Sequence, residues 1–341
     1  MATASMVTTT TELPDAIGKY YVRKVLYEQK FRLVWYLFAD KVPYVEGNGD
    51  QVKMRRYLRL DSTPMRLDEG NTGPGKKLGK ADLLVTVEWF GDYVLYSDKV
   101  KFENRDPILT IAAELLGRQS GEMLDVVLRD VAVAGTNVLY AADDAGTLGA
   151  ARTDVAGRVS APLLDKAIRA LRVNRAMEWK KSIPAGPGQG TLPVRASWPA
   201  IVDAETLYDL ERLVPGYLPC AEYGQMNKLD ENEQGAYKHI RFFLTDQGKV
   251  WEDSGATAPS DVATTDDDTD VHCIVIFGEG SFGGVKLGGK DTPVEFIAHK
   301  PGSAGSADPL NQRGSAGWKA PQAGKIKDET QMLRLEIGVT A

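Results

Sequence analysis

The feature that most constrains this chain of 341 residues is a pair of β-rich runs separated by a long polar excursion. Val52–Leu60 alternates between apolar and charged residues, and Leu83–Phe90 places Val85, Val87 and Trp89 at every second position. The residues between these runs are rich in Gly, Pro, Thr and Lys. Structureless stretches of roughly twenty residues are uncommon inside compact domains. We therefore expect a long hairpin that extends away from the body of the protein.

This excursion is basic, although the chain as a whole is acidic. Residues 50–80 contain eight Lys and Arg against four Asp and Glu, whereas the whole chain has a net charge of −6. A nucleic-acid-binding protein usually carries a basic excess, so the composition argues against a dedicated nucleic-acid binder. We expect the basic side chains of the hairpin to contribute to an assembly interface. They are Arg55, Arg56, Arg59, Lys76, Lys77 and Lys80.

A stripe of aromatic and aliphatic residues precedes the hairpin. In residues 18–40 apolar side chains recur every three to four positions, among them Tyr21, Phe31 and Trp35. This period is typical of a helix, and a helix with such a stripe must bury it. It can pack on its own domain or, as an N-terminal arm, on a neighbouring subunit. We take the three aromatic residues as candidate assembly contacts and leave both possibilities open.

The clearest helix signal begins at Asp106 and Pro107, which suit the cap and the first position of a helix. The apolar pattern continues to about Gly135, which corresponds to a helix of about 42 Å that could act as a strut. The side chains expected on its inward face are Ile108, Ile111, Leu115, Leu116, Met123, Val127, Val131 and Ala134.

The remaining two thirds of the chain predict a mixture of short strands and helices. A second helix is expected over residues 160–174, and Asp203 is expected to cap a third. The residues of the second helix expected to face inward are Leu163, Leu164, Ala167, Ile168 and Leu171. Strands are expected at 194–201, 240–244, 273–277, 284–287, 294–298 and 333–339. Residues 137–157 are expected to be a linker, and 252–270 and 301–324 irregular. The fold class is therefore α+β.

No catalytic or cofactor-binding motif stands out. Residues 75–80 (GKKLGK) differ from a phosphate-binding loop, because three residues rather than four separate the glycines and Ala81 replaces the required hydroxyl. The histidines lack metal-ligand spacing, and Cys220 and Cys273 could pair only if the fold brings them together. We expect no catalytic residue, no metal and no cofactor.

An acidic run in the second half of the chain allows several interpretations. Residues 252–270 contain seven Asp and Glu with no Lys or Arg, and Asp266, Asp267 and Asp268 are consecutive. The run could be a solvated loop, a surface that complements a neighbour's basic hairpin, or a cation site. The Gly and terminal Glu of an EF-hand are missing. We include the three consecutive aspartates among the candidate assembly residues.

Neither a secretory signal nor a membrane span is recognisable. The first twelve residues have no basic and apolar segments of a signal peptide, and no apolar run approaches the roughly 20 residues that a span needs. We expect a soluble, intracellular chain without a membrane partner.

The order of these pieces resembles that of the major capsid proteins of tailed bacteriophages with the HK97-type fold. It is more closely similar to the N4 gp56-like capsid family. The resemblance covers about residues 19 to 340. The stretches that carry it are Tyr93–Asp98, Ala170–Ala176, Ala200–Asp203, Ile240–Phe243, Phe282–Val285, Asp308–Gln312 and Gly317–Lys319.

The resemblance implies an HK97-like capsid fold with four parts. These are an N-terminal arm (1–45), an extended hairpin (46–92), a peripheral domain (93–154 and 323–341) with a spine helix at 106–135, and an axial domain (155–322). The hairpin would lie over an adjacent subunit, and the last strand would return to complete the peripheral sheet.

The function implied by the resemblance is that of a major capsid protein, which is not an enzyme. It would assemble as hexamers and pentamers into the icosahedral shell around the double-stranded DNA of a tailed bacteriophage. Its partners would be copies of itself, a separate scaffolding protein and a portal, and its location the virion, assembled in the host bacterial cytoplasm. A minor virion or decoration protein and a hydrolytic enzyme on an α+β scaffold remain alternatives.

Overall fold

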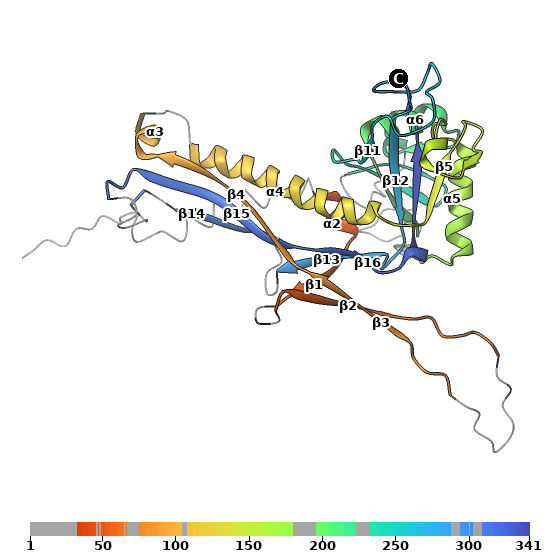
Figure 1. Cartoon of the computed structure of the whole chain (residues 1–341), viewed down its shortest axis with the longest axis horizontal. Coiled ribbons are helices and arrows are strands. Elements are labelled where there is room, and N and C mark those ends of the chain that lie inside the picture. Colours follow the sequence, from red (N-terminus) through yellow and green to blue (C-terminus); the bar gives the residue numbers. More distant parts are fainter. Residues whose placement is uncertain are drawn as a thin grey trace, which may run out of the picture.

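The computed structural model describes residues 33–45, 47, 49–64, 66, 75–103, 108–179, 196–222, 232–287, 294–299, 301–302 and 309–341. These residues form an elongated molecule with three parts (Figure 1). We call the nine-stranded sheet with α5 and α6 the body. The extension consists of α4 and the sheet of β4, β14 and β15. The hairpin consists of β2, β3 and the two legs that continue from them.

The helices are α2 (Val34–Phe38), α3 (Asp98–Glu103), α4 (Ile108–Val133), α5 (Ala161–Val173) and α6 (Ala204–Leu213), with short 3-10 turns at Arg152–Asp154, Cys220–Glu222 and Glu329–Gln331. The strands of the hairpin and extension are β2 (Gln51–Tyr57), β3 (Lys80–Thr86), β4 (Glu88–Ser97), β14 (Glu295–His299) and β15 (Arg313–Gln322). A small sheet between the parts has the order β1 (Asp40–Tyr44), β13 (Phe282–Leu287) and β16 (Gly324–Ile326).

The body is built around one sheet with the strand order β6-β5-β17-β12-β7-β10-β9-β8, and β11 pairs at the side of β12. Its strands are β5 (Val138–Ala141), β6 (Leu148–Gly149), β7 (Trp198–Val202), β8 (Leu218–Pro219), β9 (Glu233–Tyr237), β10 (Ile240–Leu244), β11 (Val250–Trp251), β12 (Val271–Phe277) and β17 (Met332–Ile337). Every residue of β7, β12 and β17 is buried, as expected for strands covered on both faces.

Helices α5 and α6 cover one face of this sheet. The buried side chains of α5 are the five that the sequence predicts, and they pack with apolar residues of β7, β10, β12 and β17. Helix α6 begins at Asp203, whose Oδ1 accepts a hydrogen bond from the Thr206 amide at 3.0 Å. The predictions of the second helix and of this cap are confirmed.

Helix α2 and the C-terminal end of α4 cover the opposite face of the sheet. Trp35 is 1% exposed, and its ring packs edge-on against Phe277 with the ring centroids 5.8 Å apart. Phe38 packs against Phe243 and Trp179 in the same cluster. Trp35 therefore lies in the core of its own chain, and its prediction as an assembly contact is wrong.

The N-terminus of α2 is held by a buried carboxylate of α4. Asp125 accepts hydrogen bonds from the amides of Val34, Trp35 and Tyr36 at 2.8–3.2 Å. Burial raises the pKa of Asp125 to about 8, while the three amide hydrogen bonds act in the opposite direction. This contact fixes the point at which the chain enters the core.

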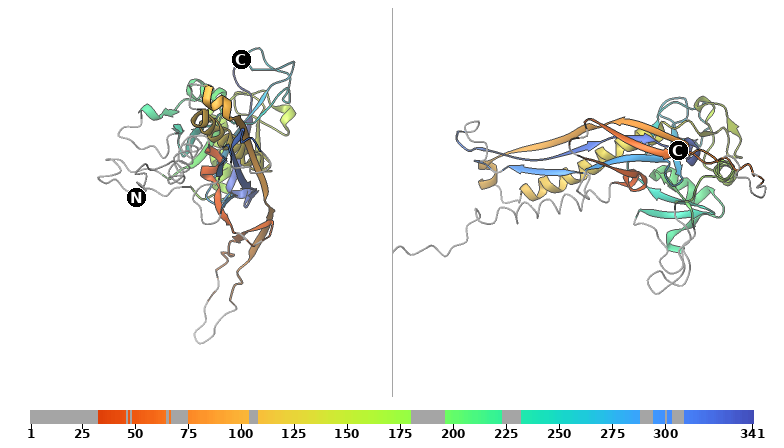
Figure 2. Two further views of the ribbon diagram at one scale, coloured as in Figure 1. Left: turned by 90° about the vertical axis from the view of Figure 1, so that its left-hand side faces the viewer. Right: turned by 90° about the horizontal axis from the view of Figure 1, so that it is seen from below.

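Helix α4 is 26 residues long and runs along one face of the β14-β15-β4 sheet (Figure 2). Leu116 and Leu124 pack with Trp318 and Ala320 of β15. The long helix is therefore confirmed over Ile108–Val133, and the predicted start at Asp106 and Pro107 lies outside the described residues. Its buried stripe is centred on Leu124 and Leu128, whereas Ile111 and Leu115, both predicted to be inward, are exposed.

Two segments expected to lack regular structure contain strands. Residues 137–157 include β5 and β6, and residues 301–324 include the ten-residue strand β15. β15 is rich in Gly, Ala and Ser, so it lacks the β-branched pattern on which the prediction relied. Small residues fit here because Tyr96 and Tyr93 of β4 lie directly over Gly314 and Gly317.

The topology also places two segments differently from the implied partition of the chain. β14 and β15 lie in the extension beside α4, although the resemblance assigns residues 155–322 to one axial unit. β17 lies within the body sheet between β5 and β12, although its segment was expected to complete the sheet of the peripheral domain. The chain therefore crosses between the two parts more often than the sequence suggests.

A buried ionic cluster joins the extension to the body. Glu336 of β17 is fully buried; its carboxylate accepts two hydrogen bonds from Arg152, at 2.7 and 2.9 Å, and lies 2.8 Å from the Arg334 Nε. Arg334 in turn donates to the carbonyl oxygens of Val133, at the end of α4, and of Gly135 just beyond it. The last turn of α4 is thereby attached to a central strand of the body.

Candidate assembly surface

The hairpin projects from the middle of the molecule (Figure 1). β2 and β3 are antiparallel, with Gln51 opposite Thr86 and Tyr57 opposite Lys80. Beyond these strands the Leu58 amide donates to the Gly79 carbonyl at 2.8 Å. The legs of the hairpin, residues 58–64 and 75–79, continue outside regular strands. The predicted long hairpin is confirmed in these ranges, and its tip lies outside the described residues.

The base of the hairpin is packed, but its outer part is not. Val52 and Met54 are buried against Val285 of β13 and against Ala323, which lies between β15 and β16. In contrast, three leucines of the legs keep 44–71% of their surface exposed: Leu58, Leu60 and Leu78. Contiguous exposed apolar groups on a soluble chain usually mark an interaction site. The legs therefore carry apolar surface that the described residues of this copy do not cover.

Within the β2–β3 ladder of the hairpin, one carboxylate, that of Asp82, lies near three cations. Asp82 lies 2.7 Å from Lys53, 2.9 Å from Arg55 and 3.7 Å from Lys80. Hydrogen bonds from Lys53 and Arg55 lower the pKa of Asp82 to about 2. The carboxylate is therefore ionised at neutral pH, and the cluster retains a surplus of positive charge.

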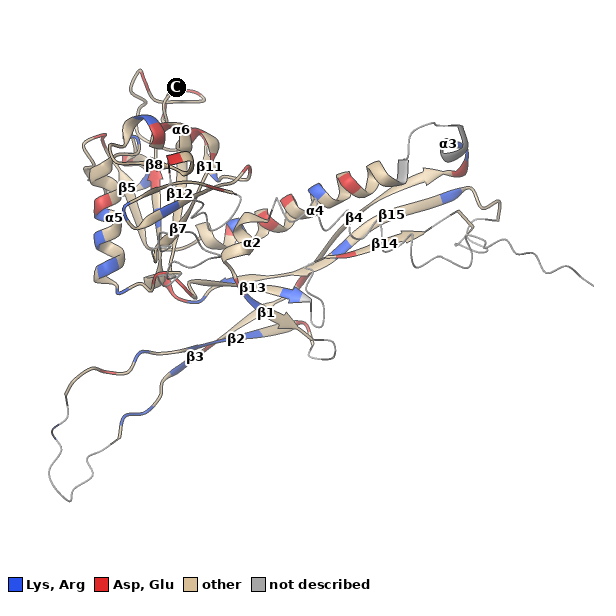
Figure 3. Cartoon of the chain, turned by 180° about the vertical axis from the view of Figure 1, so that it is seen from behind, with Lys and Arg blue, Asp and Glu red and all other residues tan. Residues whose placement is uncertain are grey.

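The other predicted basic residues of the hairpin fall into two groups. Arg56 faces the protein and contacts Asp328 at 2.7 Å, so it anchors the hairpin to the C-terminal segment. Lys76 donates to the Thr63 carbonyl at 2.9 Å and bridges the two legs. Arg59 and Lys77 are exposed and make no hydrogen bond or ion pair within the part of the chain that the structure describes. Figure 3 shows the distribution of Lys and Arg over the hairpin.

The three consecutive aspartates lie on an ordered loop of the body. Asp268 donates its amide to the Asp253 carboxylate at 2.8 Å, and Asp266 and Asp267 are exposed. The loop packs beside the C-terminus, where Val262 forms a bridge with Thr340. That it complements a neighbour's hairpin stays a prediction. Tyr21 and Phe31 lie outside the described residues.

A surface that the sequence did not single out lies on β4. Trp89, Tyr93 and Leu95 are 55–65% exposed, on the face of the sheet opposite to Phe90 and Tyr96. Their spacing at every second or fourth position was a usable signal, because it continues the period of the predicted run that ends at Phe90. Together with the hairpin, this strand forms what we call the uncovered surface.

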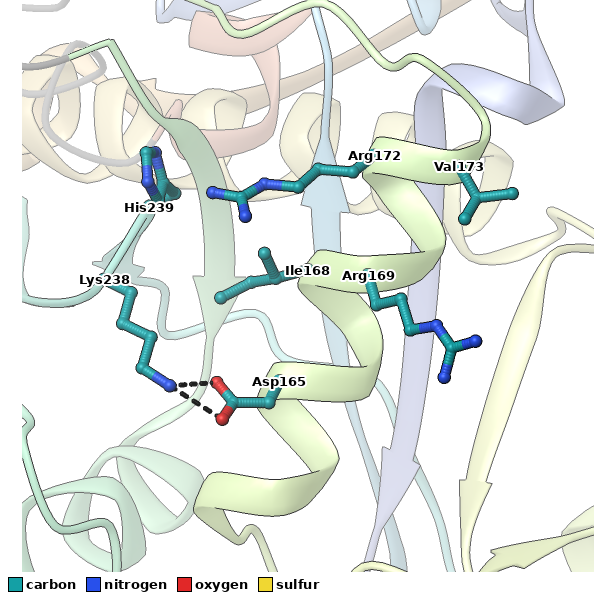
Figure 4. Close-up of a pocket in the computed structure, with 7 residues that line it drawn as sticks. All are labelled: Asp165, Ile168, Arg169, Arg172, Val173, Lys238 and His239. Carbon is teal, nitrogen blue, oxygen red and sulfur yellow. Dashed lines mark hydrogen bonds and ion pairs between the residues drawn. The ribbon is translucent and has the colours of Figure 1, made fainter.

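An open groove of about 490 Å³ lies between α5 and the turn joining β9 to β10 (Figure 4). Lys238 reaches across it and contacts Asp165 at 2.5–2.7 Å. Arg169 and Arg172, which lie on α5 as Asp165 does, also line the groove. The groove holds no nucleophile beside a general base and offers no arrangement for catalysis.

Among the described residues, no group of three or more His, Cys, Asp or Glu side chains is placed to hold a metal ion. Cys220 and Cys273 are both free thiols. No helix in the described ranges is long and apolar enough to cross a membrane.

Comparison with known proteins gives matches among solved structures only. No family model matches this sequence, and no curated protein matches it. The capsid of Ralstonia phage GP4 is 11% identical with a TM-score of 0.68, and the alignment covers 89% of this chain and 88% of that chain. The capsid of cyanophage Pam1 is 14% identical with a TM-score of 0.56, covering 89% of both chains.

A third similar structure is the capsid of cyanophage P-SCSP1u, with 13% identity, a TM-score of 0.56, and coverage of 89% of this chain and 87% of that chain. At such low identities the likeness establishes the fold. The chain therefore has an α+β, HK97-like fold, as predicted, and the similarity extends over the extension and the body together.

Proposed function

We propose that this chain is the major capsid protein of a tailed bacteriophage, and that it assembles as hexamers and pentamers into an icosahedral shell around double-stranded DNA. Within this class we assign it to the N4 gp56-like family. It acts as a structural protein rather than an enzyme, with the virion as its location after assembly in the host bacterial cytoplasm.

The observation that carries the proposal is the uncovered surface on an HK97-like fold. Apolar side chains on the hairpin legs and on β4 are left exposed by the part of the chain that the structure describes. A closed shell requires many copies that meet through different patches on each partner, so one copy donates a surface and the next accepts it. The hairpin is the donor because it projects from the molecule (Figure 1).

Further features agree with this role. The net charge of −6 suits a wall that encloses DNA without trapping it, because binding to phosphates depends on Lys and Arg. The packaged DNA is therefore enclosed without sequence-specific contacts. A separate scaffolding protein and a portal would guide the assembly, as the family resemblance implies.

The test is to express the chain in a bacterium together with its neighbouring head proteins, and to measure particle size by sedimentation and negative-stain microscopy. We expect closed particles far larger than the 37.2 kDa chain. A chain that sediments only as a monomer under every assembly condition would contradict the proposal. The number of copies per particle distinguishes a major shell protein from a decoration protein, which would require a shell made by another chain.

A further inference from the structure

The C-terminal half of α5 and the residues just beyond it are basic, although the chain as a whole is acidic. Residues 166–175 contain four Lys and Arg and no Asp or Glu, whereas the net charge of the chain is −6. Arg169 and Arg172 are three residues apart on α5, so they lie on one side of the helix. Figure 3 shows Lys and Arg on the half of α5 that is remote from the C-terminus of the chain.

These cations border the groove between α5 and the β9–β10 turn. The carboxylate that lines this groove, Asp165, is engaged by Lys238. In Figure 4, Arg172 extends across the groove and Arg169 lies on the outer side of the helix. Both are exposed and make no hydrogen bond or ion pair with the residues that the structure describes, and Val173 beside them is 72% exposed. The groove therefore presents two guanidinium groups and an apolar side chain to a partner from outside.

Arg175, just past the end of α5, stands at a position that favours glycine. Its amide donates to the Arg172 carbonyl at 3.0 Å, and the next amide donates to the Leu171 carbonyl at 2.9 Å. Helices that end with these two hydrogen bonds usually have Gly here, because the backbone is left-handed, and the φ of Arg175 is 55°. Strained backbone is concentrated at functional sites. The charge of Arg175 is therefore retained at a cost to the isolated fold.

Lys238, on the opposite side of the groove, repeats this choice. It is the first residue of a two-residue turn between Tyr237 and Ile240, and its φ is 50°. Two-residue turns usually place Gly or Asn where φ is positive. The other described residues with a Cβ and positive φ are Asp253 and Asn311, whose types tolerate this conformation. Both cations in left-handed conformations within the described ranges therefore lie beside this groove.

The acidic run at 252–270, which we call the acidic loop, has the complementary properties. It contains seven Asp and Glu and no Lys or Arg. Asp266 and Asp267 are exposed, and their carboxylates accept no hydrogen bond within the described part of the chain. The loop is ordered, since the Ala258 amide donates to the Asp267 carbonyl at 3.1 Å. Presenting the two carboxylates to a partner therefore costs little conformational entropy.

The acidic loop cannot reach these cations within one copy, because the two surfaces are attached to opposite ends of β17. Beyond α5, the Met177 amide donates to the Gln331 side chain at 2.7 Å, just before β17 begins. The loop is attached after β17 ends, where Val262 forms a bridge with Thr340. Nine residues of extended chain lie between these attachments and span about 30 Å. Any contact between the two surfaces therefore joins different copies.

We propose that the acidic loop of one copy docks on the basic side of α5 in a second copy, with Asp266 and Asp267 paired to Arg169 and Arg172. The inference rests on the proposed function, because it specifies one contact between copies of the shell. Guanidinium groups bind carboxylates through paired hydrogen bonds. The two surfaces differ, so each copy donates a loop and accepts another, and the contact can repeat around a ring.

An exchange of charge between the two surfaces tests this contact. The first variant carries Arg169→Glu and Arg172→Glu, the second carries Asp266→Lys and Asp267→Lys, and the third carries all four changes. Because the four side chains are exposed, each variant should unfold near the wild-type urea concentration. We expect the particle yield to fall about tenfold in the first two variants, where like charges meet, and to return to within about threefold of the wild type in the third.

A fourth variant controls for net charge. It combines Arg169→Glu and Arg172→Glu with Glu205→Lys and Glu211→Lys, which change two exposed residues of α6. Its net charge is again −6, because the two kinds of change cancel. We expect its particle yield to stay as low as that of the first variant. A recovery equal to that of the third variant would overturn the pairing, because net charge alone would then explain the yields.

The two proposals fail differently in this experiment. Wild-type particle yields from the folded first and second variants, or a loss that the third variant does not repair, would overturn the pairing and leave the proposed function intact. Absence of particles from the wild type under all assembly conditions would overturn both. Normal shells of the first variant that retain less DNA, with no effect of the second variant, would identify DNA phosphates as the ligand and would also overturn the pairing.

Arg175 gives a readout that a merely structural residue would not give. Arg175→Gly relieves the left-handed backbone, so we expect the isolated chain to melt a few degrees higher than the wild type. We expect the same variant to give fewer particles, because a cation beside the docking surface is lost, whereas Arg175→Lys should assemble normally. An unchanged particle yield from Arg175→Gly would contradict the use of this charge between copies.

Direct contact between copies is read by zero-length cross-linking. Arg169→Lys and Arg172→Lys keep the charge and supply amines, which a carbodiimide joins to carboxylates in contact with them. Chains labelled with nitrogen-15 are mixed with unlabelled chains before assembly. We expect mixed-label links from positions 169 or 172 to Asp266 or Asp267, and a link between Lys238 and Asp165 within one copy as the internal control. Absence of the mixed-label links while the control link forms, or links from the acidic loop to hairpin lysines instead, would overturn the proposal.

Discussion

The body and the uncovered surface use the same kinds of side chain in opposite ways. In the body, each residue of β12 and β17 is buried between helices on both faces of the sheet. On β4 most residues are exposed, including large aromatic and aliphatic ones. The described residues of the body therefore cover one another, whereas they leave the hairpin legs and much of β4 exposed.

This difference indicates where changes should affect stability and where they should affect assembly. A change inside the body alters the free energy of unfolding of the isolated chain, because burial occurs on folding. A change on the uncovered surface leaves that free energy almost unchanged and alters the contacts between copies. The following predictions test this separation, from the largest expected effect to the smallest.

The largest effect is expected from shortening the hairpin. Residues 59–78 are replaced by Asn-Gly, a turn that suits the close approach of Leu58 and Gly79 in the ladder. We expect the chain to unfold at nearly the wild-type urea concentration and to form no closed shells, as measured by urea titration and sedimentation. Normal shells from this variant would show that the hairpin is dispensable for assembly.

The second effect concerns the ionic cluster that joins α4 to the body. Glu336→Ala leaves the buried Arg334 and the partly buried Arg152 without their shared carboxylate, which should cost about 3–5 kcal/mol. The measurement is the free energy of unfolding of the isolated chain. The matched control is Lys238→Ala, which breaks the exposed pair with Asp165 and should cost less than about 1 kcal/mol. Equal losses in both variants would contradict the assigned role of the cluster.

A smaller effect is expected at Asp125. Asp125→Ala removes the acceptor for three amides of α2 and should cost about 1–3 kcal/mol in the free energy of unfolding. The sign of its pH dependence follows from a pKa that is raised in the folded chain to about 8. Between about pH 4 and 8 the folded chain retains a proton that the unfolded chain releases, so stability should fall as the pH rises. Asp125→Asn should flatten this slope, and an unchanged slope in that variant would argue against the assignment.

The smallest effect is expected at Asp82, whose pKa of about 2 depends on Lys53 and Arg55. Its folded pKa lies below the ordinary value, so the contribution of its ion pairs is present at neutral pH and is lost as the pH falls from about 4 to 2. Arg55→Ala should raise the pKa of Asp82 toward its ordinary value, as measured by NMR titration of the carboxyl carbon. Because the cluster is exposed, the melting temperature at pH 7 should hardly change. A pKa of Asp82 unaffected by Arg55→Ala would contradict the ion pair between these two side chains.

The sequence predicts an element well where a single periodic pattern decides it. The buried side of α5 was predicted residue by residue, because all five apolar residues face one sheet. The hairpin was predicted because its strands alternate strongly and the excursion between them is long. The Asp203 cap was predicted because the acceptor and the helix it serves are adjacent in sequence.

The sequence predicts poorly where a distant segment decides the environment. Trp35 belongs to a stripe that could face a neighbour, and only the folded chain shows that Phe277, some 240 positions later, covers it. β15 was not predicted as a strand because it is rich in small residues, and these fit only because tyrosines of β4 lie over its glycines. Ile111 and Leu115 fit the helical period as well as Leu116, but they lie on the exposed side of α4, whereas Leu116 is buried. For the same reason the sequence indicates the hairpin part of the uncovered surface but not β4, because the exposure of β4 depends on which face of the sheet α4 covers.

The most direct test of the account is hydrogen–deuterium exchange of the same chain before and after assembly. We predict that amides of the hairpin legs, and the β4 amides that are not hydrogen-bonded to β15, exchange rapidly in the free chain and become protected in particles, while those of β12 and β17 are protected equally in both states. Unchanged exchange of β4 and the hairpin on assembly would contradict the claim that other copies cover them.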